Sequence, residues 1–334
     1  MKPFGVLGGL SLALLLVTGT SLLLGRYDLA PSQGLHALLL PLGLGGTVDP
    51  ALSTLISEVR LPRVAGALLI GAALAISGTA FQALFMNPLV SPGVLGVLSG
   101  AAFGAALALL AGGAWWLVQT AAFLCGLLAV ALALWLGRRG GENALTLLVL
   151  GGMISGALFT AFLSVVKYVA DPYNTLPAIV YWLMGSLALI DATALAWSAP
   201  LMGAGILLLA VQGHALNVMS LGDDEARALG LNVKRQRLFI ILLATLLGAM
   251  TVVLAGMIGW VGLVIPHIAR LLFGADNRLL LPASALLGAL YLVLVDDVAR
   301  LALTVEIPLG ILTALIGLPV FAWALRNVHR GWRG

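Results

Sequence analysis

Charged residues are scarce in this sequence. Asp, Glu, Lys and Arg make up 9% of its 334 residues, whereas hydrophobic residues make up 61% and the mean hydropathy is +1.12. A soluble domain carries roughly 25% charged and 45–50% apolar residues. A soluble fold of this length would lack the polar side chains that its surface needs, so we expect lipid to surround most of the chain.

Residues suited to catalysis or metal binding are also few. The single cysteine, Cys125, lies in an apolar run, which excludes a disulfide within the chain. The four histidines are scattered, and neither an HExxH sequence nor a Cys/His cluster with metal-ligand spacing occurs. Asp296 and Asp297 are adjacent, so on a helix their side chains point about 100° apart and do not face each other. We therefore expect no catalytic residue, no metal site and no cofactor.

A phosphate-binding loop of the form GxxxxGK[ST] is absent as well. The chain therefore has no ATP site of the usual kind, and any ATP that drives it must be bound by another subunit. The pI near 9.6 is compatible with nucleic-acid binding. The basic residues lie at the ends of apolar runs and in the connections between them, so membrane topology explains them better, and we expect no nucleic-acid partner.

Long, unbroken apolar runs fill most of the sequence. In lipid every backbone N–H and C=O must pair internally, and a helix that crosses the membrane takes about 20 apolar residues. The runs do not have the alternating pattern of a β-barrel. The sequence therefore predicts an all-α integral membrane protein, a single transmembrane domain over residues 1–334. About ten spans are expected, at 4–24, 64–85, 93–112, 115–136, 144–167, 191–211, 238–258, 260–273, 279–298 and 308–325.

The first and eighth of these spans are unusual. The run at 4–24 follows Lys2 as a signal peptide would, but it is longer than the apolar part of a usual signal peptide and many spans follow it, so we interpret it as a membrane helix. The run at 260–273 is short for a full crossing and contains Pro266, His267 and Arg270. We expect it to begin as a broken or re-entrant element packed inside the protein.

The distribution of basic residues predicts the orientation. With an even number of spans, both ends of the chain lie on the same side of the membrane. If that side is cytoplasmic, 12 of the 17 basic residues lie inside. The five that lie outside are Arg26, Arg60, Arg63, Lys167 and Arg300. Because basic residues favour the cytoplasmic side, we expect a multi-pass protein with cytoplasmic N- and C-termini.

The connection at 217–237 is the most polar stretch and lies on the expected cytoplasmic side. Ser220 is expected to cap a helix that begins near Leu221, since Ser is a favoured N-cap and the acidic residues that follow suit the positive end of the helix dipole. Gly230 is expected to end that helix, because Gly tolerates left-handed backbone. Short helices on the inner face suit docking to another protein, but an ordinary solvated loop explains the same residues.

Three arginines, Arg60, Arg63 and Arg300, lie just outside the second and ninth expected spans. Permanent cations on the outer face suit the carboxylates of a partner or an anionic substrate. Anchoring in lipid headgroups also accounts for them, as does pairing within the chain, with Glu58, Asp296, Asp297 or Glu306.

The segment from Ser77 to Gly100 contains helix-breaking residues between two spans. Asn87-Pro88 and Ser91-Pro92-Gly93 interrupt the helical pattern there. A tight inner turn explains them, and so does a constriction in a transport pathway.

Six segments together resemble one family, the type II ABC importer permeases that take up iron–siderophores, haem and cobalamin. They follow the family's order: RLPR at 60–63, FQALFMNPLVSPGVLGVLSGAAFG at 81–104, YWLMGSL at 181–187, LGDDEARALGLNV at 221–233, GWVGLVIPHIARLLFGADNRLLLP at 259–282 and DDVARLALTVEIPLGILTALIGLPVFAWAL at 296–325. Each motif alone is weak, but six in order extend over nearly the whole chain.

This resemblance implies a permease subunit with ten spans that forms a homodimer or close heterodimer in the cell inner membrane. It also implies two ATPase subunits that bind ATP and magnesium, and a periplasmic or lipid-anchored substrate-binding protein. Arg60, Arg63 and Arg300 would dock the binding protein, and Asn87, Pro88 and Leu89 would form a cytoplasmic gate. The residues that would couple to the ATPase are Leu221, Gly222, Asp223, Asp224, Glu225, Ala226, Arg227, Ala228, Leu229 and Gly230.

The resemblance also bears on the substrate and on the competing class of transporter. It favours an iron–siderophore or haem, then cobalamin, then molybdate or tungstate. The competing class is a secondary transporter driven by ions, which often keeps ionisable residues at mid-membrane. The expected spans hold almost none at their centres, which disfavours that alternative.

Overall fold

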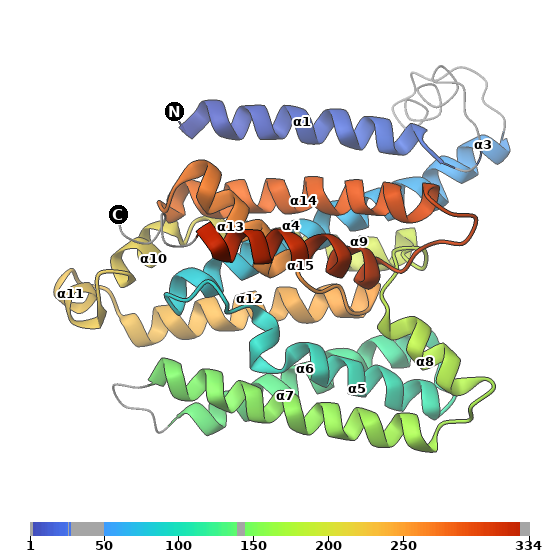
Figure 1. Ribbon diagram of the computed structural model, residues 1–334, viewed down its shortest axis with the longest axis horizontal. Helices are drawn as coiled ribbons and strands as arrows, with labels where there is room; N and C mark the ends of the chain where they lie inside the picture. The colour runs from blue at the N-terminus through green and yellow to red at the C-terminus, as the bar shows by residue number, and fades with distance from the viewer. Residues whose placement is uncertain (1–2, 26, 28–49, 139–143, 328–334) are drawn as a thin grey trace.

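Long helices lie side by side along one direction in the computed structural model (Figure 1), which describes residues 3–25, 27, 50–138 and 144–327. Some of the basic residues and histidines considered above lie outside that part. They are Lys2, Arg26, His36, Arg139, His329, Arg330 and Arg333. Ten of the described helices match the expected spans to within a few residues. They are α1 (Pro3–Leu23), α4 (Leu61–Leu84), α5 (Val97–Leu110), α6 (Trp115–Gly137), α7 (Ala144–Val169), α9 (Ala192–Ala210), α12 (Val233–Ala255), α13 (Val261–Phe273), α14 (Asn277–Leu301) and α15 (Leu309–Asn327).

Seven of the described helices are long and apolar enough to cross a membrane, and three apolar helices are shorter. The 13 residues of α13 span about 20 Å at 1.5 Å per residue, less than the ~30 Å hydrocarbon core. This helix follows Trp260, whose φ of 68° is unusual for a residue with a side chain, and it contains Pro266. The short eighth element expected from the sequence is therefore present as one continuous helix that packs against α4 and α14, and its broken or re-entrant start stays a prediction.

Shorter helices connect the long ones. They are α3 (Pro50–Thr54), the π-helix η2 (Leu55–Arg60), the 3-10 helix η3 (Pro92–Leu95), α8 (Thr175–Leu183), α10 (Gly213–Met219) and α11 (Asp223–Ala228). The α10–α11 pair lies at the same end as the start of α1 and the end of α15, whereas α3 and α8 lie at the opposite end (Figure 1). We name these the α11 end and the α8 end.

Helix α4 is the most enclosed of the long helices, and glycines set its distance from its neighbours. A Cβ atom added to Gly78 would clash with the carbonyl oxygen of Gly262, at the start of α13. Added Cβ atoms on Gly71 of α4 and Gly288 of α14 would each clash with the other glycine's carbonyl oxygen. Small residues allow helix backbones to approach closely in lipid, so these glycines place α4 directly against α13 and α14.

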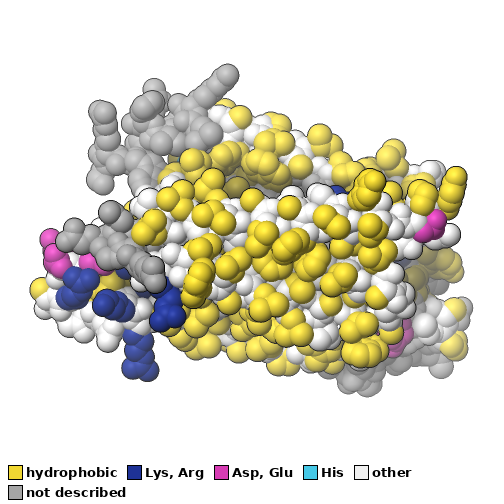
Figure 2. All heavy atoms as spheres, turned by 90° about the horizontal axis from the view of Figure 1, so that it is seen from below, with side chains coloured by type: hydrophobic (Ala, Val, Ile, Leu, Met, Phe, Trp, Pro, Cys, Tyr) yellow, Lys and Arg dark blue, Asp and Glu magenta, His cyan; other side chains and the backbone are white. Residues whose placement is uncertain are grey.

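Hydrophobic side chains cover the long body of the molecule, while Lys and Arg gather at the α11 end (Figure 2). Many of these exposed side chains are leucines and aromatic residues that water would not favour, among them Leu15, Leu128, Trp135 and Phe162. This distribution is that of a protein whose sides face lipid and whose ends face water.

Candidate functional site

Arg60 lies at the α8 end, where η2 joins α4, and it is only 5% exposed. Its guanidinium donates to the carbonyl oxygens of Leu22, Leu23 and Tyr27 at 3.0, 2.7 and 2.8 Å. The last carbonyls of an α-helix have no N–H partner within the helix. Arg60 therefore satisfies the C-terminus of α1 and places a positive charge at the negative end of its dipole.

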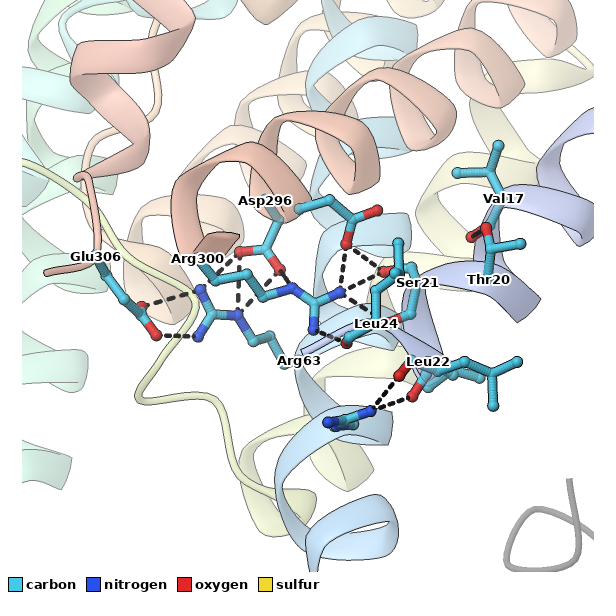
Figure 3. A network of polar contacts seen from close by, with 12 residues as sticks. Val17, Thr20, Ser21, Leu22, Leu24, Arg63, Asp296, Arg300 and Glu306 are labelled. Atoms are coloured by element: carbon cyan, nitrogen blue, oxygen red, sulfur yellow. Dashed lines mark hydrogen bonds and ion pairs between the residues drawn. The ribbon is translucent and has the colours of Figure 1, made fainter. Parts of the chain in front are cut away.

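Arg63, one turn further along α4, lies in a buried network of ion pairs (Figure 3). Its Nε and Nη2 donate to the carboxylate of Asp296 on α14 at 2.9–3.1 Å. Its Nη1 and Nη2 donate to Glu306, both at 3.0 Å. Arg63 is 9% exposed and Asp296 1% exposed. Two carboxylates thus hold one guanidinium through charge-assisted hydrogen bonds, and the network joins α4 to α14 and to the segment before α15.

Arg300, near the end of α14, completes this network and is 6% exposed. It donates to the carbonyl oxygens of Ser21 and Leu24 at 2.7 Å each, and it pairs with Asp297. The Ser21 hydroxyl donates to the same Asp297 carboxylate at 2.7 Å. Arg300 therefore links α1 to α14, and it also donates to carbonyl groups at the end of α1 that have no N–H partner within the helix.

The three arginines expected to dock a binding protein are therefore brought together by α1, α4 and α14, but their side chains point into the protein. The pairing within the chain that the sequence offered as an alternative is present for Asp296, Asp297 and Glu306. Asp296 and Glu306 lie 233 and 243 residues from Arg63, whereas Asp297 and Asp296 lie three and four residues from Arg300. Sequence spacing therefore signalled the pairs of Arg300 and not those of Arg63. Docking by these arginines stays a prediction.

The polar connection before α12 forms α10 and α11 (Figure 1). Ser220 does not cap α11, and that prediction is wrong. Its hydroxyl donates to the carbonyl oxygen of Asn217 at 2.7 Å, since it still lies within reach of the free carbonyls of α10. Gly222, with φ of 124°, occupies the N-cap position, and α11 begins at Asp223. Gly230 has φ of 85°, which confirms the left-handed residue expected after the helix.

Hydrogen bonds tie this connection to two long helices. The Asn217 side chain donates to the carboxylate of Asp276 at 2.6 Å. It also accepts from the backbone N–H and the side-chain amide of Asn277, the first residue of α14, at 2.9 Å each. Arg237 of α12 donates to Asp223 of α11 at 2.7 Å. A displacement of α10 or α11 must therefore move α12 and α14 or break these contacts. Nothing in the local sequence pattern signals the Asn217 contact, because its partner lies 59 residues away.

Asp276 is stabilised in its ionised form. The backbone N–H of Arg278 donates to it at 3.0 Å, and the side chains of Asn217 and Arg278 donate as well. These hydrogen bonds hold the pKa of the Asp276 carboxyl below its usual value. The link between α10 and α14 therefore does not change its charge near neutral pH.

Apolar side chains of α11 and its flanks project from the α11 end. Ala226 is fully buried, whereas Leu221 and Leu229 are 61% and 66% exposed and Ala228 is exposed beside them. Acidic residues, Asp224 and Glu225, are exposed on the same short helix. These leucines are exposed at the end of the molecule, beyond the lipid-facing body.

The residues expected to form a gate, Asn87, Pro88 and Leu89, make the turn after α4. The Asn87 side chain accepts the backbone N–H of Leu89 at 2.9 Å, and the Asn87 N–H donates to the carbonyl oxygen of Gln82 at 3.1 Å. Leu89 is half exposed. The turn is thus held by its own hydrogen bonds and presents one large apolar side chain. In the part of the chain that the structure describes, no group of three or more His, Cys, Asp or Glu residues is placed to hold a metal ion.

The sequence matches the FecCD transport family over residues 13–327. It is 41% identical to the molybdate import system permease protein MolB of Haemophilus influenzae over 98% of this chain and 96% of that protein. It is 37% identical to the vitamin B12 import system permease protein BtuC of Salmonella paratyphi A over 96% of this chain and 94% of that protein. The fold is similar to an inward-facing structure described as a metal-chelate type ABC transporter, with a TM-score of 0.87, 39% identity, and coverage of 97% of this chain and 99% of that one.

A family match of this extent agrees with the helical multi-span fold. The ATPase of such an importer is a separate subunit, and the importer also has a substrate-binding protein. This chain belongs to the FecCD transport family and is the permease subunit of an ABC importer.

Proposed function

We propose that two copies of this chain assemble with two ATPase subunits in the cell inner membrane and import a metal chelate that a binding protein delivers. The observation that supports this most is α11, a short acidic helix beyond the apolar body, with exposed Leu221 and Leu229 on its flanks. Residues 221–230 would contact the ATPase. Residues 1–334 would act as one transmembrane domain.

The orientation we propose has α11 and both termini on the cytoplasmic side. The start of α1 and the end of α15 lie at the α11 end (Figure 1), and Lys and Arg gather there (Figure 2). Basic residues favour the cytoplasmic side of a membrane. The α8 end, with Arg60, Arg63 and Arg300, would then face the binding protein.

In the mechanism that we propose, ATP binding closes the ATPase dimer and displaces the two copies of α11. The Asp223–Arg237 and Asn217–Asp276 contacts would carry that displacement into α12 and α14. ATP would thus shift an equilibrium between outward-open and inward-open packings of the helices. The turn at Asn87, Pro88 and Leu89 would close the cytoplasmic side in one of them.

Docking would use the three arginines in different ways. Arg60 donates to backbone carbonyls, and an acidic side chain of a binding protein would be a stronger acceptor than these. Arg300 donates to carbonyls at the end of α1 but also pairs with Asp297, so an acidic side chain of the binding protein would compete with that carboxylate. Arg63 already binds two carboxylates, so we assign it the role of holding the docking surface in shape.

The substrate that we propose belongs to the class of metal chelates, with an iron–siderophore or haem, cobalamin, and molybdate or tungstate as candidates. The identities to the molybdate and vitamin B12 permeases differ by a few percentage points, 41% and 37%, which is too little to order the candidates. An uptake assay decides between them. The chain would be reconstituted with its ATPase and binding protein, and each radiolabelled candidate would be offered with and without ATP. ATP-dependent uptake of one candidate is expected, whereas uptake driven by an ion gradient without ATP would contradict the proposal.

A further inference from the structure

A cavity of about 500 Å³ opens at the α11 end, between the ends of α6, α7 and α12 and beside α11. Its lining divides into two parts. Lys and Arg side chains stand around the mouth, and leucine and isoleucine side chains form the deeper wall. Figure 2 shows basic side chains gathered at this end, next to the hydrophobic body.

Helix α12 carries this change of polarity along a single face. Lys234, Arg237, Leu238 and Ile241 line the cavity at spacings of three, four and seven residues, which places them on one side of the helix. At 1.5 Å per residue, Ile241 lies about 10 Å deeper than Lys234. The cationic groups therefore lie within the first five residues of α12, and the apolar groups lie where the helix enters the body.

Helix α6 repeats the pattern in the opposite chain direction. It ends at Gly137, with Arg138 directly after it and Leu134 one turn earlier, and all three line the cavity. The cation again lies nearer the end of the molecule and the leucine lies deeper. The two cavity walls thus share one polarity gradient, which runs along the direction of the long helices.

The described residues that line the cavity carry more positive than negative charge. Asp223 is the acidic residue among them, and it already pairs with Arg237 at 2.7 Å and with Arg227 at 3.5 Å. The side chains of Arg138 and Lys234 form no ion pair or hydrogen bond with residues of the described ranges 3–25, 27, 50–138 and 144–327. Two cations therefore face this space without an anion from those ranges.

We propose that this cavity binds an anionic phospholipid, with the phosphate between Arg138 and Lys234 and an acyl chain along Leu134, Leu238 and Ile241. Basic pockets between transmembrane helices on the cytoplasmic side suit anionic headgroups. A free phosphate would use only the mouth and would leave the apolar wall uncovered. The leaflet rests on the proposed orientation, whereas the chemistry of the site depends only on the cavity.

The test is lipid binding by the full-length permease, measured by native mass spectrometry after titration with phosphatidylglycerol or phosphatidylcholine. Wild type is expected to bind phosphatidylglycerol in preference. The double variant Arg138→Gln/Lys234→Gln is expected to bind it about tenfold or more weakly, because each cation near an anionic lipid contributes to binding. Arg235→Gln is the matched control, since Arg235 is an exposed cation next to Lys234 that does not line the cavity. An equal loss in the control would overturn the proposal.

Two further arms separate the lipid from other occupants. Leu238→Ser is expected to weaken phosphatidylglycerol binding while the melting temperature of the permease stays unchanged. Full displacement of the lipid by millimolar inorganic phosphate, with normal binding by Leu238→Ser, would show a site for free anions and overturn the proposal. Displacement by saturating ATPase subunit would show a protein contact and overturn it as well. Failure of ATP-driven uptake in the separate reconstitution would bear on the proposed function and leave these lipid measurements unaffected.

Discussion

Single residues at the α8 end show why the same amino acid serves different purposes a few positions apart. Arg60 binds carbonyl oxygens at the end of α1, Arg63 binds the carboxylates of Asp296 and Glu306, and Arg300 binds both carbonyl oxygens and the carboxylate of Asp297. A carbonyl that loses its guanidinium can be hydrated near the membrane surface. A buried carboxylate that loses its guanidinium keeps an uncompensated charge. Substitutions of these arginines should therefore have distinguishable effects.

For Arg60 we predict an effect on docking. Arg60→Glu is expected to weaken association of the binding protein and to reduce the salt dependence of that association, because a cation that meets acidic residues has become an anion. The basal ATPase activity of the assembled transporter should persist. Binding measured at two salt concentrations checks this, and an unchanged affinity at both would assign Arg60 to the capping of α1 alone.

For Arg63 we predict an effect on stability. Arg63→Leu is expected to lower the free energy of unfolding by about 3–5 kcal/mol, since it leaves the buried Asp296 with only the 3.7 Å contact to Arg300 and removes the partner of Glu306. Adding Asp296→Leu should restore part of the loss, because it removes the buried charge. Thermal unfolding of the single and double variants in detergent measures both. A single variant as stable as wild type would show that the ion pair contributes nothing.

At the scale of the element, the packing of α4 predicts a contrast between two glycines. Gly78→Ala places a methyl group against the carbonyl oxygen of Gly262, and helix backbones must separate to admit it. Overpacking of this kind costs about 1–3 kcal/mol, so yield and melting temperature should fall. Gly203→Ala in α9 is the control, since its added Cβ would meet no atom within 4 Å. Equal losses in both variants would contradict the close packing of α4.

Helix α11 gives a prediction about coupling. Ala228→Trp adds bulk to an exposed face that the ATPase would cover, and Gly230→Val puts a β-branched side chain where φ is 85°. A Cβ at Gly230 would meet no atom within 4 Å, so backbone strain is the expected cause of any effect there. Both variants should dock the binding protein and retain some ATP hydrolysis, but transport should fall.

Separate measurements of assembly, hydrolysis and uptake distinguish this outcome from misfolding. Misfolded variants would lose expression and assembly together. Normal uptake by both variants would show that residues 221–230 form only a solvated loop, and the proposed coupling mechanism would fail with it.

The elements differ in how far the sequence predicts them. The spans were predictable because lipid demands long apolar runs, and even the short α13 was signalled by Pro266 and its length. The sequence did not predict α8 (Thr175–Leu183), because a nine-residue helix at the edge of the membrane needs neither an apolar run of membrane-spanning length nor a polar face. The cap of α11 was misassigned to Ser220, since the sequence does not show that the preceding residues already form α10.

The candidate site was predictable in its residues but only partly in its contacts. Charge and position indicated Arg60, Arg63 and Arg300, and the resemblance gave them a role. These arginines are buried because α1 and α14 pack beside α4. That packing is tertiary, and no local pattern in the sequence signals it.

At the scale of the whole molecule, α14 connects the two regions where partners are expected. Its start binds Asn217 beside α11, and its last turns carry Asp296, Asp297 and Arg300 beside α1 and α4. Its 25 residues extend about 37 Å at 1.5 Å per residue. Because polar contacts fasten this helix at both ends, we propose that it carries displacement between an ATPase on one side and a binding protein on the other.

Two features of the whole molecule predict how it assembles with its partner subunits. A chain without a phosphate-binding loop cannot hydrolyse ATP in the usual way, and exposed Leu221 and Leu229 beyond the lipid-facing body need a protein cover. Coexpression with the cognate ATPase should therefore yield a complex of two permease and two ATPase subunits, with its mass measured by light scattering. Leu229→Asp should release the ATPase, because it places a charge on the covered surface, while the two permease copies stay together in the membrane.

Liposomes that contain the permease alone should show no substrate uptake. Uptake by a monomeric permease in such liposomes would contradict both the assembly and the ATP-driven mechanism, because nothing would then remain for α11 to couple.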